Sequence, residues 1–205
     1  MKKHLIALAA LLTGLVSGNA QNVAEEPVEH AVQLSVRAAA NRHASKEFGI
    51  DGAWKQQLRT NMYFNGGISL AIDNTPSFWF NAEQTMRNPS AAMFEVGIPL
   101  QIEFGKLNYS CGSFYGLVGV TPTFYSTMSY KYLDQSTRKM VDGDKKSGFI
   151  IAPVLEAGRN FTAASHIFRF GLYATYKFNC TPGDFNIYHR VAGRMFVGVK
   201  LGMIL

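Results

Sequence analysis

The last eleven residues alternate between two kinds of side chain. From Met195 to Leu205 every odd position is large and apolar, whereas Gly198, Lys200 and Gly202 stand at even positions. A β-strand turns successive side chains to opposite faces, so the segment predicts a strand with one apolar and one mixed face.

Six further segments alternate in a similar way, a seventh over residues 148–158 is apolar on both faces except at Glu156, and turn-forming or hydrophilic stretches separate them. The expected strands cover residues 32–38, 61–72, 77–86, 94–104, 114–124, 148–158 and 168–178, before the closing strand that ends at 205. Residues 41–60 and 131–147 are expected to form two long loops at the outer end. An even strand number with short turns at one end and long loops at the other is typical of bacterial membrane barrels. The predicted fold is therefore all-β, an eight-stranded antiparallel transmembrane up-and-down β-barrel with a packed polar interior.

The amino terminus has the three parts of a secretory signal peptide. Lys2 and Lys3 precede an apolar stretch over residues 5–16, and small residues stand before Gln21. The apolar stretch is shorter than the roughly 20 residues that a membrane-spanning helix needs. We expect cleavage near Ala20, a signal peptide over 1–20 and one barrel domain over 21–205. The expected location is the outer membrane of a Gram-negative bacterium, in contact with outer-membrane lipid. The formal charge of +6 is no argument for nucleic-acid binding, because no Lys/Arg cluster stands alone and the chain is exported.

Charged residues recur on the polar face of the expected strands, with both signs represented. Buried charges persist only when they are paired, so these residues predict a structural charge network inside the barrel. Its expected members are Arg37, Glu83, Glu95, Glu103, Glu156, Arg169, Lys177, Arg194 and Lys200.

A soluble exported barrel that binds a hydrophobic ligand would alternate too, but with its apolar face inward. Six glycines, at positions 67, 97, 119, 171, 198 and 202, fall on the polar face. A solvent-exposed strand gains nothing from them, whereas the crowded bore of a small barrel gains room. The glycines therefore favour lipid on the outside.

One hairpin resembles a known family. Residues 95–104, Glu-Val-Gly-Ile-Pro-Leu-Gln-Ile-Glu-Phe, precede an aromatic and glycine-containing strand over residues 114–122. The pair is similar to the central hairpin of the PorT-like outer-membrane β-barrels of Bacteroidota. The resemblance implies an eight-stranded barrel but no single activity, since the family includes a secretion-system component and many proteins of unknown role.

Catalytic chemistry has little support in the sequence. His43, Ser45 and His189 are weak candidates for a lipid-modifying site of the lipid A deacylase or acyltransferase type, because a histidine base can activate a serine nucleophile. No two histidines stand at metal-ligand spacing, and no phosphate-binding loop occurs. We therefore expect no catalytic residues, no metal, no cofactor and no enzymatic activity. The expected role is structural or interactive, with outer loops or the barrel side contacting an envelope partner.

Overall fold

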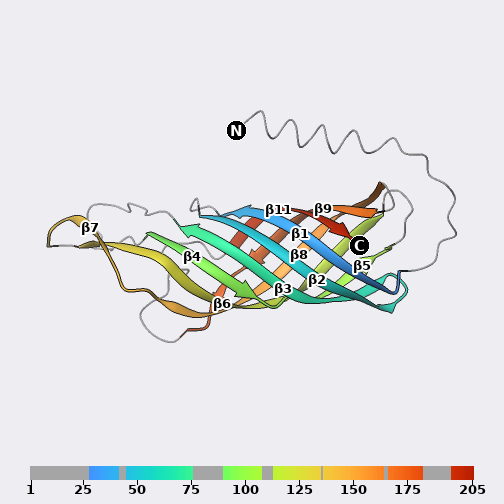
Figure 1. Cartoon of the computed structure of the whole chain (residues 1–205), viewed down its shortest axis with the longest axis horizontal. Coiled ribbons are helices and arrows are strands. Elements are labelled where there is room, and N and C mark those ends of the chain that lie inside the picture. The colour runs from blue at the N-terminus through green and yellow to red at the C-terminus, as the bar shows by residue number, and fades with distance from the viewer. Residues whose placement is uncertain are drawn as a thin grey trace, which may run out of the picture.

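The structure is a computed structural model that describes residues 28–41, 45–75, 90–107, 113–134, 136–163, 166–181 and 195–205. Most of the described residues lie in β-strands (Figure 1). The strands are β1 (His30–Ala40), β2 (Lys46–Arg59), β3 (Met62–Thr75), β4 (Ser90–Gly97), β5 (Leu100–Gly105), β6 (Phe114–Asp134), β7 (Lys139–Asp142), β8 (Ser147–Ala163), β9 (His166–Tyr176), β10 (Phe178–Asn179) and β11 (Met195–Ile204). Within the described ranges no helix is long and apolar enough to cross a membrane.

The sheet closes on itself as a barrel with eight antiparallel positions in its wall. We call each position a stave, whether it consists of one strand or of two strands in line. Each stave pairs with the next along the chain, and β11 pairs back with β1. β4 and β5 form one stave, because both pair with β3 and with β6 and the pairing keeps its register across Ile98 and Pro99. β9 and β10 form another, interrupted at Lys177, and both pair with β8. The predicted eight-stranded up-and-down barrel is thereby confirmed.

The first of the two expected long loops is wrong, and the second contains a β-hairpin. Residues 46–59 form β2, which pairs with β1 over Lys46–Gln56 and also pairs with β3. Alternation is present there, since Phe48, Ile50 and Trp54 point outward and Glu47, Asp51 and Lys55 inward, but Gly49 and Gly52 obscure it. In the second loop, β6 continues to Asp134 and pairs with β7, so Lys131–Asp134 and Lys139–Asp142 form a paired hairpin.

The expected strand over residues 77–86 lies outside the described residues. The ring closes without it, because β2 supplies the eighth stave. Asp73 and Asn74 were expected in the turn between the strands over 61–72 and 77–86, but they lie within β3.

The two ends of the barrel differ. At one end the β6–β7 hairpin projects beyond the other strands (Figure 1), and we call this the hairpin end. At the other, the carboxyl-terminal end, Leu205 exchanges backbone hydrogen bonds with Val32, and β2 turns into β3 through Thr60 and Asn61. Asn61 adopts a left-handed φ of 63°, which asparagine tolerates better than most residues.

The faces of the wall are opposite in character. Large apolar side chains are exposed on the outside of all eight staves, for example Ile68 at 60% and Leu172 at 60%. The inward positions carry buried Gln, Ser, Thr, Asn and charged residues. A soluble barrel that binds a hydrophobic ligand has the reverse arrangement. These polar inward residues therefore do not form a cavity for such a ligand.

Candidate functional site

The interior concentrates charge. Eleven inward side chains of the described staves are charged and almost inaccessible to solvent. They are the cations Arg37, Lys55, Arg169, Lys177 and Lys200 and the acids Glu47, Asp51, Asp73, Glu95, Glu103 and Glu156. Burying an unpaired charge is very costly, so their mutual pairing is a condition of the fold.

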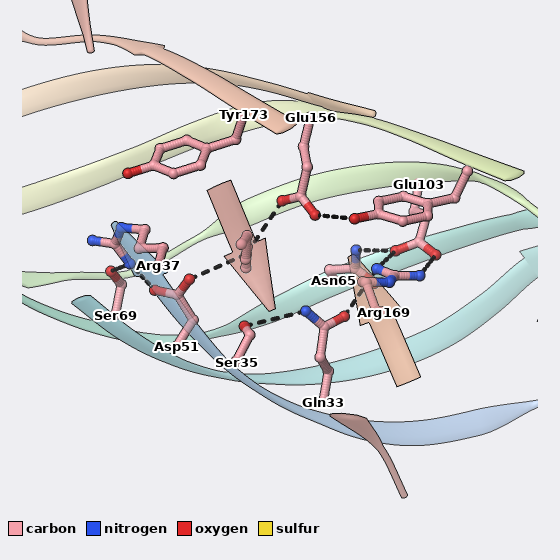
Figure 2. A network of polar contacts seen from close by, with 12 residues as sticks. Gln33, Ser35, Arg37, Asp51, Asn65, Ser69, Glu103, Glu156, Arg169 and Tyr173 are labelled. Atoms are coloured by element: carbon pink, nitrogen blue, oxygen red, sulfur yellow. Dashed lines mark hydrogen bonds and ion pairs between the residues drawn. The ribbon is translucent and has the colours of Figure 1, made fainter. Parts of the chain in front are cut away.

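Glu103 is the centre of the cluster nearest the carboxyl-terminal end. Arg169 makes a two-pronged contact with it, Nη2 to Oε1 at 2.5 Å and Nη1 to Oε2 at 2.8 Å. Lys55 forms an ion pair with the same carboxylate, and Asn65 donates to it at 3.0 Å. Gln33 accepts a hydrogen bond from Arg169 at 3.0 Å (Figure 2). One carboxylate is thus satisfied by staves β2, β3 and β9 together.

A second cluster lies at mid-height. Asp51 pairs with Arg37 and, at 3.1 Å, with Lys200. Lys200 also lies 3.3 Å from Glu156, whose other oxygen accepts a hydrogen bond of 2.6 Å from the Tyr115 hydroxyl. The guanidinium of Arg169 stacks over the Tyr115 ring at 3.7 Å, so Tyr115 connects the mid-height cluster to the Glu103 cluster.

Lys177 is the centre of the cluster nearest the hairpin end. Its ammonium lies 2.6 Å from Glu47, 2.8 Å from Glu95 and 3.3 Å from Asp73. Arg37 donates to the remaining side of Glu47 at 2.8 Å, which joins this cluster to the mid-height one. The charged side chains therefore form one connected network along the bore.

Glycines on the inward face make room for the larger members. A Cβ at Gly171 would collide with the Tyr115 hydroxyl and come within 3.0 Å of Glu156. A Cβ at Gly49 would lie 2.6 Å from the Arg37 guanidinium carbon. These two positions lack a side chain because the network occupies the space.

The structure places seven of the nine expected network residues in this interior. These are Arg37, Glu95, Glu103, Glu156, Arg169, Lys177 and Lys200. Glu83 and Arg194 lie outside the described residues.

The sequence-based prediction missed four members, Glu47, Asp51, Lys55 and Asp73. The first three were assigned to a loop and the fourth to a turn. The signal that could have found the first three was their alternation with Phe48, Ile50 and Trp54, and for Asp73 it was the continued alternation after Leu70 and Ile72.

The candidates for catalysis are not brought together by the described residues. His43 and His189 lie outside them. Ser45 is completely buried, and its hydroxyl has no hydrogen-bond partner among the described groups. Its backbone N–H donates to the Asn41 side chain at 3.1 Å. Nor do the described His, Cys, Asp and Glu side chains include a group of three placed to hold a metal ion.

Comparison with known proteins gives no family. No family model matches the chain, and no curated protein matches it.

Three solved structures are similar at low identity. Neisserial surface protein A is 11% identical with a TM-score of 0.45, covering 87% of this chain and 97% of that one. The N-terminal β-barrel domain of Pseudomonas aeruginosa OprF is 7% identical with a TM-score of 0.43, covering 88% and 100%. Ail, the attachment invasion locus protein of Yersinia pestis, is 12% identical with a TM-score of 0.44, covering 87% and 97%. The register between strands, rather than this likeness, establishes the barrel.

Proposed function

We propose that this chain is a non-enzymatic outer-membrane β-barrel with a closed bore, which contacts an envelope partner through its outer surface. The observation that carries the proposal is the outward face. It is apolar on every stave, and aromatic residues lie at both ends of several staves.

The spacing of these aromatic residues matches a membrane. Phe94 and Phe104, Phe114 and Phe124, and Phe168 and Phe178 each stand ten positions apart on one stave. Ten residues of antiparallel strand extend about 34 Å. At a tilt of about 40° this gives about 26 Å along the barrel axis, close to the apolar band of roughly 25 Å in outer-membrane barrels. The proposed membrane span runs between the two aromatic bands.

The orientation follows from the connections. β2 turns directly into β3 at the carboxyl-terminal end, and short turns face the periplasm in bacterial barrels. We therefore assign that end to the periplasm and the hairpin end to the cell surface. Export by the signal peptide over 1–20, with cleavage near Ala20, is part of the same proposal.

The β6–β7 hairpin is the described part of the outer surface best suited to contact a partner. It is ordered by its own contacts: Lys146 N–H donates to the Thr127 hydroxyl at 2.7 Å, and Gly143 N–H donates to the Tyr130 carbonyl at 2.8 Å. At its tip Asp134 accepts hydrogen bonds from Ser136 and Thr137. These hydrogen bonds lower the pKa of Asp134 below its ordinary value, and the bond from the Thr137 hydroxyl has the largest effect. The hairpin therefore presents a fixed, charged surface.

Membership of the PorT-like family is a further part of the proposal. It is supported by the sequence over 95–122 alone. The two segments that carry the resemblance are paired neighbours, β4 and β5 with β6.

Fractionation of cells that express the whole chain tests this function. We expect recovery in the outer membrane and a mobility shift between unheated and heated samples on a denaturing gel, because a folded barrel resists detergent until heated. Recovery in the soluble periplasm without detergent would overturn the proposal.

A further inference from the structure

The bore contains a polar chamber at mid-height. Its walls include the charged residues Arg37, Asp51, Glu156 and Lys200 and the smaller Thr121 and Ala152. Because cavities with several polar partners hold water and apolar ones stay dry, this chamber is suited to water.

Towards the hairpin end the chamber is followed by apolar side chains. Met93, Tyr125, Ile150 and Phe196 point inward from β4, β6, β8 and β11, and each has 0% exposure. They pack together beside Lys177, whose ammonium lies 4.6 Å from the centre of the Phe196 ring. We call these four residues the hairpin-end layer.

A second apolar group lies at the opposite mouth. Tyr63, Leu107, Ile167 and Ile204 pack together with exposures of 2–3%. Tyr63 and Ile167 stand two residues before Asn65 and Arg169, members of the Glu103 cluster, on the same inward faces. We call these four residues the carboxyl-terminal layer.

We propose that these two apolar layers, and not the ion-pair network, are the barriers that close the bore around a hydrated chamber. The inference rests on the proposed membrane barrel and names the residues that keep it from conducting. Narrow apolar segments exclude water and ions by dewetting, whereas charged and polar walls support hydration. The barrel thus holds a latent path for water and small ions, interrupted once at each end.

Thiol labelling tests each barrier separately. Thr121→Cys, in a chain whose own cysteines are replaced by Cys111→Ser and Cys180→Ser, places a reporter in the chamber wall. The purified folded barrel in detergent micelles is treated with a small charged thiol reagent. We expect Met93→Ala with Phe196→Ala to speed labelling at least tenfold, and Tyr63→Ala with Ile167→Ala to do the same through the other mouth.

Matched controls lie on the same strands. Phe94→Ala with Val197→Ala truncates the outward neighbours of Met93 and Phe196, and should leave the labelling rate unchanged. A heat-dependent mobility shift shows that each variant is folded. Folded inward variants that label no faster than their controls would overturn the proposal.

Conductance in planar bilayers gives the second readout. We expect no current steps from the unaltered barrel or from either layer variant alone, and steps from the two combined. Steps from a folded Glu103→Gln variant with both layers intact would make the ion pairs the barrier and overturn the inference. Steps from the unaltered chain would refute a closed bore altogether, whereas recovery of the chain outside the membrane would refute the proposed function itself.

Discussion

At the residue scale, Glu103 is the carboxylate that two completely buried cations share. It is fully buried and contacts both Arg169 and Lys55. Glu103→Gln should lower the free energy of unfolding by about 3–5 kcal/mol, because it leaves two buried cations without their carboxylate. The measurement is urea unfolding of the barrel in lipid vesicles. Asp142→Asn is the matched control, since Asp142 is 84% exposed in its pair with Lys131 at 3.6 Å, and exposed pairs contribute little. Equal losses in both variants would contradict the assignment.

Gly171 supports a second prediction at this scale. A methyl group there collides with the Tyr115 hydroxyl, whereas a Cβ at the outward Gly116 meets nothing within 4 Å. Gly171→Ala should therefore cost roughly 1–3 kcal/mol of stability through overpacking, and Gly116→Ala should cost far less. Urea midpoints measure both. In a Tyr115→Phe background, which removes the colliding oxygen, the cost of Gly171→Ala should fall, and an undiminished cost would show that the collision is not its cause.

At the scale of elements, β2 was expected as a loop, and the structure shows that it belongs to the barrel wall. If Ile50, 60% exposed on β2, faces lipid, Ile50→Arg should cost about 2–4 kcal/mol, the penalty for a cation near the bilayer midplane. Met140→Arg on the projecting hairpin, where Met140 is 40% exposed, should leave stability unchanged. Refolding into vesicles from urea compares the two, and a harmless Ile50→Arg would return residues 46–59 to a surface loop.

At the scale of the whole molecule, the proposed non-enzymatic role predicts that the chain does not modify its surrounding lipid. The His43→Ala, His189→Ala double variant should leave the mass spectrum of lipid A unchanged relative to cells carrying the unaltered chain, and cells without the chain should match both. A lipid A species that appears with the unaltered chain and disappears in the variant would instead establish a lipid-modifying enzyme.

The sequence by itself determined the strands at 195–205, 94–104 and 168–178, and which face of each is apolar. Alternation is local, because successive side chains of any strand point to opposite sides. It also identified seven inward charges, such as Glu103 and Lys177, since a charge at a polar-face position can only turn into the bore. Where Gly49 and Gly52 leave gaps in the alternation, the local signal failed, and β2 was missed together with Glu47, Asp51 and Lys55.

Only the tertiary structure decided which charges meet. Glu103 joins Lys55 and Arg169, which lie 48 and 66 residues away in the chain. Such pairing depends on the register between neighbouring strands and on the closure between β1 and β11. No single segment of the sequence determines either of these. The apolar layers at the two mouths have the same origin. Met93, Tyr125, Ile150 and Phe196 interrupt polar faces on four different staves, and ring closure alone places them side by side.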